Sequence, residues 1–240
     1  MADQKEMRAV YVETLMSLVE EGKDIIVLEA DLMRATGTTA FAKKYPERAI
    51  NVGVAEADLV GVASGLSAGG KIPFAATFGC FASRRAYDQF FLSANYAHLN
   101  VKLVGTVPGV TAAYNGGTHM PFEDLTLMRV IPNLTIAEPP DAASLAAVTR
   151  IAAETDGCFY LRLQRKAAPQ IYPDDETFEL GRAKVLRRGK DVTLVALGTV
   201  MVNEALKAAA SLAEEGIEAT VIDAIWLAPL DEATILANSP

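Results

Sequence analysis

Short apolar runs alternate along this chain with longer segments that carry apolar residues at helical spacing. The run DIIVLEAD (24–31) follows a helical segment at 6–22, and KIPFAATF (71–78) follows another at 51–70. Three later runs continue the alternation, at 100–109, 133–141 and 158–165. Asp141 ends the second of these and can cap the helix after it. Apolar runs separated by helices are typical of parallel strands buried on both sides, so we predict an α/β fold with a parallel sheet and helices on both faces.

The composition changes near residue 169, where proline and charged residues become frequent. We interpret 1–168 as a first domain and 169–189 as a linker. A new strand–helix–strand unit follows, at 192–198, 199–217 and 219–227. Two strands make a marginal sheet by themselves, so we expect 190–240 to be the beginning of a second α/β domain.

Charge and hydropathy exclude several classes of protein. The chain has 240 residues, is 51% hydrophobic and carries a net charge of −8, whereas chains that bind nucleic acid are usually basic. No apolar run approaches the roughly 18 residues that span a bilayer, and the N-terminus lacks the pattern of a signal peptide. We predict a cytoplasmic protein with neither nucleic-acid nor membrane partners. Cys80 and Cys158 are expected to be free, buried thiols, because neither has a cysteine or histidine at metal-ligand spacing.

The segment NVGVAEADLVGVASGLSAGG (51–70) combines a buried-helix pattern with acids near its start. Positions with almost no side chain recur at every fourth residue, at Gly53, Ala57, Gly61 and Gly65. Such a stripe indicates close packing, either on the chain's own sheet or against another subunit. Glu56 lies where the helix dipole favours a negative charge, and composition alone favours a capping or salt-bridged glutamate there.

A glycine-rich turn carries one of the chain's two histidines. In AAYNGGTHMPFEDL (112–125), the Asn-Gly-Gly sequence predicts a tight turn, and His119 follows it. Parallel sheets bind ligands outside the carboxyl ends of their strands, which is where this turn lies. Taken alone, His119 is equally consistent with a structural and a catalytic role.

Two aromatic residues end the strand at 71–78 and begin the next segment. In TFGCFASRRAYDQ (77–89), Phe78 and Phe81 precede Arg84 and Arg85. Paired aromatics usually belong to a core, and they can also form a wall for a flat ring.

Four motifs, in this order and at these separations, resemble the pyrimidine-binding part of transketolases. They are NVGVAEADLVGVASGLS, PFAATFGCFASRRAYDQ, GGTHMPFEDLTLMRVIPNLTI and FYLRLQR. The resemblance covers essentially the whole chain, with the pyrimidine-binding domain ending near residue 168 and the start of the transketolase C-terminal domain after it. It implies the fold with which thiamine diphosphate enzymes hold the aminopyrimidine ring of that cofactor.

The resemblance implies a role for each residue singled out above. Glu56 matches the glutamate that hydrogen-bonds N1′ of the aminopyrimidine ring and so activates the ring's 4′-nitrogen as a base. A carboxyl group in an apolar pocket can share a proton with a ring nitrogen, which fits this role. Phe78 and Phe81 match the aromatics that stack on the ring. His119 matches an active-site histidine that hydrogen-bonds the donor sugar and assists proton transfer.

Further positions are implied to contact cofactor or substrate. Asp31, in an "ADL" segment, and Arg84 are assigned to the cofactor. The positions that match groups facing a sugar phosphate are Arg8, Arg34 and Arg165. Asn115 stands where many members have an aspartate that contacts a substrate hydroxyl. An amide both donates and accepts, so substrate preference can differ from the usual xylulose 5-phosphate.

The resemblance also implies a partner. Full-length transketolases carry a Gly-Asp-Gly…Asn motif that binds Mg²⁺ and the cofactor's diphosphate, and this sequence has no such motif. We therefore expect a split transketolase, in which a separate N-terminal subunit supplies the metal site and two such pairs form a dimer of heterodimers. The expected activity is transfer of a two-carbon ketol unit between sugar phosphates.

Three alternatives remain open. The motifs RAYDQ and THMPFEDL also resemble 1-deoxy-xylulose-phosphate synthase and, less closely, the beta subunits of 2-oxo acid dehydrogenases, which use pyruvate or another 2-oxo acid. A non-catalytic interaction subunit could retain the same fold, because fold does not imply activity. A dinucleotide-binding site is disfavoured, because no GxGxxG opens a helix after the first strand.

Overall fold

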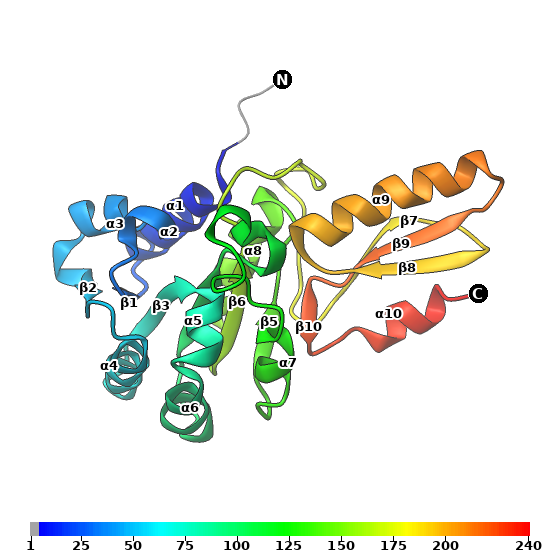
Figure 1. Ribbon diagram of the computed structural model, residues 1–240. Helices are drawn as coiled ribbons and strands as arrows, with labels where there is room; N and C mark the ends of the chain where they lie inside the picture. The colour runs from blue at the N-terminus through cyan, green and yellow to red at the C-terminus, as the bar shows by residue number, and fades with distance from the viewer. Residues whose placement is uncertain (1–4) are drawn as a thin grey trace.

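The structure is a computed structural model that describes residues 5–240, and its centre is a seven-stranded sheet (Figure 1). The strands are β1 Ile25–Glu29, β2 Ala49–Asn51, β3 Ile72–Phe78, β4 Lys102–Thr106, β5 Thr135–Ala137, β6 Phe159–Leu163 and β10 Trp226–Ala228. Their spatial order is β10-β5-β6-β4-β3-β1-β2. All neighbours pair in parallel except β10, which is antiparallel to β5. The predicted parallel sheet is confirmed, because each of the five apolar runs contains one of its strands.

Helices cover both faces of this sheet (Figure 1). On one face, α1 (Met7–Glu20) and α8 (Ala142–Glu154) pack together over a core that includes Tyr11 and Phe74. The predicted cap of α8 is confirmed, since the Asp141 side chain accepts a hydrogen bond of 3.0 Å from the Ser144 backbone N–H.

The opposite face is covered by α4 (Glu56–Ala68), by a helix formed from α6 (Tyr87–Gln89) and a π-helical continuation (Phe90–Tyr96), and by α7 (Asp124–Arg129). The remaining short helices are α2 Met33–Thr36, α3 Thr39–Lys44, α5 Gly79–Arg84 and two 3-10 helices, Pro46–Arg48 and Gly109–Asn115.

A second, three-stranded sheet follows the first domain. Its order is β7-β9-β8, formed by β7 (Lys184–Arg187), β8 (Val192–Ala196) and β9 (Ala219–Asp223). Helix α9 (Gly198–Glu214) packs on it, and α10 (Glu232–Ala237) follows. Strand β7 lies inside the predicted linker, and it is antiparallel to β9.

The predicted strand at 219–227 is divided into two. Ile225 has a φ of +56°, a left-handed backbone conformation that a straight strand cannot contain. The residues before it form β9 in the second sheet, and those after it form β10, which returns to the edge of the first. The chain therefore passes directly from a strand of the second sheet to a strand at the edge of the first sheet.

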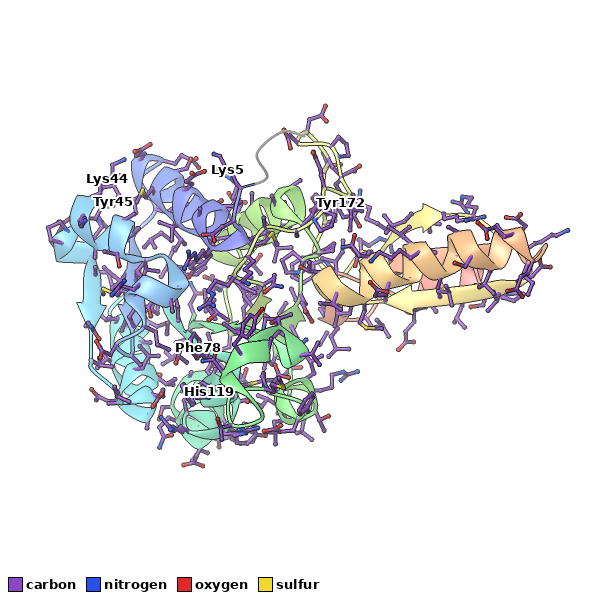
Figure 2. All side chains as sticks on the ribbon, turned by 45° about the horizontal axis from the view of Figure 1, so that its top comes forward. Lys5, Lys44, Tyr45, Phe78, His119 and Tyr172 are labelled. Atoms are coloured by element: carbon purple, nitrogen blue, oxygen red, sulfur yellow. The ribbon has the colours of Figure 1, made fainter. Side chains whose placement is uncertain are left out.

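The linker is held against both domains. Asp141 accepts hydrogen bonds from the backbone N–H groups of Ile171 and Tyr172, at 2.9 and 2.8 Å. The Tyr172 hydroxyl donates to Asp223 at 2.6 Å, and Figure 2 shows Tyr172 between the two domains. Burial raises the pKa of the Asp223 carboxyl to about 7. The linker is thus an ordered part of the fold.

The stripe of small residues on α4 does not pack on the chain's own sheet. Gly53 precedes α4 and has a φ of +76°, so its predicted place in the helical stripe is wrong, and the stripe consists of Ala57, Gly61 and Gly65. A Cβ atom placed at Gly61 or Gly65 would have nothing within 4 Å. The expectation of close packing within the chain is therefore wrong, and the subunit contact stays a prediction.

Cys80 and Cys158 are free and buried, as predicted. Within the described residues, no helix is both long and apolar enough to cross a membrane.

Candidate functional site

Two aromatic rings meet at the carboxyl end of β3, near the middle of the sheet. Phe78 is the last residue of the strand, and α5 begins at once and carries Phe81. The two ring centroids lie 5.9 Å apart with 23° between the planes, a stacked arrangement. The predicted pair of aromatics is therefore formed at the edge of the sheet where parallel folds bind ligands.

His119 lies against both of these rings. Its ring centroid is 6.1 Å from that of Phe78 and 5.4 Å from that of Phe81, and both contacts are edge-on. Phe78 and His119 are labelled in Figure 2. The Thr118 hydroxyl is 2.8 Å from the His119 Nδ1 and fixes the ring's orientation. The Gly-rich turn thus places its histidine over the aromatic pair.

Glu56 joins the same group through an arginine. It is the first residue of α4, where the helix dipole stabilises its charge, and it is only 4% exposed. The Arg85 Nη1 donates to both of its oxygens, at 3.1 and 3.3 Å. The Arg85 guanidinium also lies 4.3 Å from the centre of the Phe81 ring, a cation–π contact. The structure therefore places a cation beside Glu56, whose surroundings the sequence suggested were apolar.

These contacts define one group of side chains, which we call the edge cluster. Its members are Glu56, Phe78, Phe81, Arg85 and His119. They come from the start of α4, from the end of β3, from α5 and the residue that follows it, and from the loop that precedes α7. A buried carboxylate, a stacked aromatic wall and an imidazole in contact can hold a flat, nitrogen-containing ring and move protons near it.

Arg84 points to a different partner from its neighbour. It forms an ion pair with Glu123 and donates to the backbone oxygens of Thr118 and Met120, each at 3.4 Å. These acceptors lie on both sides of His119 in the chain. In this structure Arg84 therefore holds the loop that carries His119, and its assignment to the cofactor stays a prediction.

Asn115 and Arg165 line one small cavity. This cavity, of about 120 Å³, lies beside the loop after β4, and Tyr114 and Lys166 also contribute to it. The Lys166 ammonium is 5.8 Å from the centre of the Tyr114 ring. Two residues predicted to contact substrate are thus brought together, next to a second cation.

Arg8 and Arg34 line a different and larger pocket of about 620 Å³, together with Thr39 and Lys43. The Arg8 Nη1 donates to the backbone oxygens of Arg34 and Ala35, at 3.3 and 3.2 Å. The Arg8 backbone N–H also donates to the Arg165 carbonyl, at 3.2 Å. The three predicted substrate arginines therefore lie on neighbouring segments, with Arg8 and Arg34 at the larger pocket and Arg165 at the smaller cavity.

Asp31 lies at the carboxyl end of β1 and has a φ of +61°. Its backbone N–H donates to the Asn51 side chain at 3.0 Å, and the same oxygen accepts from the Gly53 N–H. This contact ties the "ADL" segment to the residues just before Glu56. Among the described residues, no group of three or more acidic, histidine or cysteine side chains is arranged to hold a metal ion.

Two residues near the site, Arg85 and Glu29, had no role expected from the sequence. Arg85 stands four positions after Phe81, the spacing at which residues on a helix touch, and this spacing could have indicated the stacking contact. Glu29 is fully buried at the end of β1. One of its oxygens accepts from Thr36 and Thr38, at 2.6 and 2.7 Å, and the other has no partner. Burial raises the pKa of Glu29 to about 7.

A buried network lies behind the His119 loop. Arg162, in the FYLRLQR motif, pairs with Asp124 at 2.8 Å and with Glu138 at 2.7 Å. The Tyr160 hydroxyl also donates to Asp124, at 2.9 Å. Asp124 is the first residue of α7, so the network fixes the end of the loop. A Cβ at Gly198, the first residue of α9, would collide with the Glu138 side chain, which shows how closely the second domain approaches.

Comparison with known proteins identifies the family. The model of the family described as "Transketolase, pyrimidine binding domain" matches residues 3–170. The model of the family described as "Transketolase, C-terminal domain" matches residues 181–239. A 6-deoxy-6-sulfo-D-fructose transketolase subunit from Clostridium sp. (strain MSTE9) is 48% identical over 233 residues, which cover 97% of this chain and 72% of the relative. An apulose-4-phosphate transketolase subunit from Actinobacillus succinogenes is 35% identical, over 96% of this chain and 74% of the relative.

A solved structure agrees with this result. The structure described as "Split gene transketolase, inactive beta4 tetramer" superposes with a TM-score of 0.89 and is 45% identical, covering 98% of this chain and 76% of that one. The first-domain match alone spans more than half of the sequence, and both domains match in order. The chain therefore belongs to the transketolase family.

Proposed function

We propose that this chain is the pyrimidine-binding subunit of a split, thiamine diphosphate-dependent transketolase. The observation that carries the proposal is the edge cluster, in which Glu56, Phe78, Phe81 and His119 converge at the carboxyl edge of the sheet. The match to the transketolase pyrimidine binding domain supports a thiamine-type ring as the ligand of this cluster.

The residues of the cluster fit an aminopyrimidine ring. Glu56 is buried, and within residues 5–240 its side chain accepts hydrogen bonds from Arg85 alone. The Arg85 side chain is 52% exposed. A buried carboxylate paired with a half-exposed cation is able to exchange that partner for a ring nitrogen. Phe78 and Phe81 offer a stacked wall of the size that a flat ring needs.

Each side chain has a separate task in the proposed reaction. When bound, thiamine diphosphate supplies the carbon nucleophile that accepts the two-carbon ketol unit. Glu56 holds a proton at N1′ of the pyrimidine, and Phe78 and Phe81 orient the ring. His119 hydrogen-bonds the sugar and takes or returns a proton at the reacting oxygen.

The diphosphate and its Mg²⁺ are assigned to a separate partner subunit. Two observations support this assignment: the sequence has no Gly-Asp-Gly…Asn motif, and the split-gene relative is described as an inactive assembly of beta chains alone. Gly61 and Gly65, in the small-residue stripe on α4, are exposed in this chain, which suits a subunit contact. The assembly we propose is a dimer of heterodimers.

The proposed substrates are sugars that carry a strong acid group. One relative is named for a sulfonated sugar and another for a sugar phosphate. Arg8, Arg34 and Arg165 can supply the cations that such a group requires, because guanidinium groups bind tetrahedral oxyanions well. Asn115 beside Arg165 offers both a donor and an acceptor to a sugar hydroxyl.

Reconstitution tests this function. The chain is mixed with its diphosphate-binding subunit, thiamine diphosphate and Mg²⁺, and is supplied in parallel with a ketose phosphate, a sulfonated ketose and pyruvate. The proposal expects ketol transfer from a sugar donor to an aldose, without release of CO₂. Consumption of pyruvate with CO₂ release would favour the 2-oxo acid alternatives. A pair that fails to bind the cofactor would favour a non-catalytic subunit.

A further inference from the structure

We infer that Arg85 is a placeholder for the cofactor's aminopyrimidine ring, which it imitates in the cofactor-free chain and which must displace it. The inference rests on the proposed function, because it takes the edge cluster as the ring's binding site. It goes further by assigning a function to a residue outside the expected set of cofactor contacts.

The first observation is that Arg85 makes the two contacts that the ring would need. Its guanidinium is flat and lies 4.3 Å from the centre of the Phe81 ring, in the place of a stacked heterocycle. Its Nη1 donates to both Glu56 oxygens, at 3.1 and 3.3 Å, in the place of a protonated ring nitrogen. A planar cation that stacks on an aromatic and donates to a carboxylate therefore has the same chemistry as the proposed ligand.

The second observation is that Glu56 cannot lose this partner without a replacement. The Glu56 side chain is 4% exposed, and a buried carboxylate without a hydrogen-bond donor is strongly disfavoured. The start of α4 supplies a favourable dipole, and Arg85 supplies the donor hydrogens. A cofactor-free chain thus needs a temporary partner for Glu56.

The third observation is that Arg85 is free to leave. Its side chain is 52% exposed, and within residues 5–240 it has no hydrogen-bond acceptor other than Glu56. Its neighbour Arg84 is held by Glu123 and by two backbone oxygens of the His119 loop. Of the two adjacent arginines, one is fixed to the loop and the other can turn out into solvent.

The Arg85 guanidinium and the pyrimidine ring cannot both stack on Phe81 at the same time. Both need the Glu56 oxygens, and both need the face of Phe81 that Arg85 now covers. Binding of the ring therefore requires that the Arg85–Glu56 pair break. Because the ring gives Glu56 a new donor in exchange for Arg85, Glu56 is never left unpartnered. The exchange therefore lowers the affinity by only a modest factor and leaves binding possible.

Cofactor affinity in the reconstituted complex tests the inference. The dissociation constant of thiamine diphosphate is measured by calorimetry, at saturating Mg²⁺, for the wild-type chain, Arg85→Ala and the matched control Arg129→Ala. Arg129 is exposed at the end of α7 and makes no hydrogen bond or ion pair with any residue in the described part of the chain. We expect Arg85→Ala to bind about five-fold more tightly, equivalent to about 1 kcal/mol, and the control to match the wild type.

Chemical rescue in the chain alone provides the second measurement. Removal of the Arg85 side chain leaves Glu56 unpartnered, so Arg85→Ala should melt at a lower temperature than the wild type. Methylguanidinium should raise this melting temperature more than equal concentrations of methylammonium, and it should not do so for the wild type or for Glu56→Gln/Arg85→Ala. The planar ion refills the place that the side chain occupied.

The outcomes separate this inference from the proposed function. Unchanged or weaker cofactor binding by Arg85→Ala would overturn the placeholder, since Arg85 would then be a bystander or a direct contact. Equal responses of Arg85→Ala to the two ions would also overturn it. In either case ketol transfer by the wild-type complex would leave the proposed function standing. Full transfer activity of Glu56→Gln would instead remove the proposed function.

Discussion

The Arg162 guanidinium donates two hydrogen bonds to the Asp124 carboxylate, from Nε to Oδ2 at 2.8 Å and from Nη2 to Oδ1 at 3.2 Å. Asp124 is fully buried, and Arg162 also pairs with the buried Glu138. One arginine thus satisfies two carboxylates, at the start of α7 and at the boundary with the second domain. The pair holds the end of the loop that carries His119.

Replacement of Arg162 by leucine should destabilise the chain strongly. Asp124 and Glu138 would be left buried without their cation, a change that typically costs about 3–5 kcal/mol in the free energy of unfolding. Urea denaturation measures this loss, with Arg129→Leu as the control. The control should change stability by less than about 0.5 kcal/mol, because Arg129 is exposed. A loss below about 1 kcal/mol for Arg162→Leu would show that the network is not structural.

Arg84→Gln should loosen the His119 loop without unfolding the chain. Arg84 and Glu123 are each about two-fifths exposed, so their pair contributes little to global stability. The loop nevertheless loses the hydrogen bonds at Thr118 and Met120. Amide hydrogen exchange should become faster in residues 116–123 and stay unchanged in the strands of the sheet. Glu123→Gln should give the same pattern, and an unaltered loop in both variants would refute the positioning role.

Glu29 should make the chain less stable as the pH rises. Its pKa is raised by burial from 4.5 to about 7, so the folded chain holds its proton more tightly than the unfolded chain does. This contribution to stability is complete below the unfolded pKa and is lost as the pH rises through the folded pKa. Between about pH 5.5 and about pH 8.5, the loss from this group alone is about 2 kcal/mol.

The Glu29→Gln variant allows the contribution of Glu29 to this loss of stability to be measured. Urea unfolding at the two pH values should show a smaller decline for the variant than for the wild type. Some decline should remain, because the pKa of Asp223 is also raised to about 7 and acts in the same direction. Identical pH dependence in the two proteins would mean that Glu29 stays ionised when folded.

Substitutions on the α4 stripe should separate folding from assembly. A Cβ at Gly61 meets open space, so Gly61→Ala should stabilise the isolated chain by about 0.5–1 kcal/mol through helix propensity. Gly61→Gln should leave the isolated chain folded but weaken its association with a second copy or with the partner, as measured by sedimentation velocity. Ala208→Gln, at an exposed position of α9, is the control for a bulky change. Unchanged association in Gly61→Gln would show that the stripe is not an interface.

Much of the first domain could be predicted because local patterns determine it. The apolar runs that became β1, β3 and β4 are buried on both faces, and Asp141 caps α8 through residues only three positions away. The second domain was less predictable. Strands β7 and β10 are each only a few residues long, and β10 pairs with a strand in the other domain.

Four of the five side chains of the edge cluster could be predicted from the sequence, but Arg85 and the contacts among the five could not. The resemblance indicated Glu56, Phe78, Phe81 and His119, and the structure brings these side chains into one cluster. The pair that links them joins residues 29 positions apart, and no local pattern reports such a contact. The orientations of Arg84 and Arg85 were likewise hidden, because adjacent residues of the same type differ only in the direction that the helix gives them.

The turnover of the Glu56→Gln variant shows whether Glu56 holds a proton at N1′ of the cofactor's pyrimidine ring. Glutamine keeps the size of the side chain and a hydrogen-bonding oxygen, but it cannot hold the proton at the pyrimidine N1′. In the reconstituted complex saturated with thiamine diphosphate and Mg²⁺, the account predicts that kcat for ketol transfer falls by about 10²-fold or more, while Arg129→Gln retains wild-type turnover. A Glu56→Gln complex that transfers the ketol unit at the wild-type rate would contradict the account.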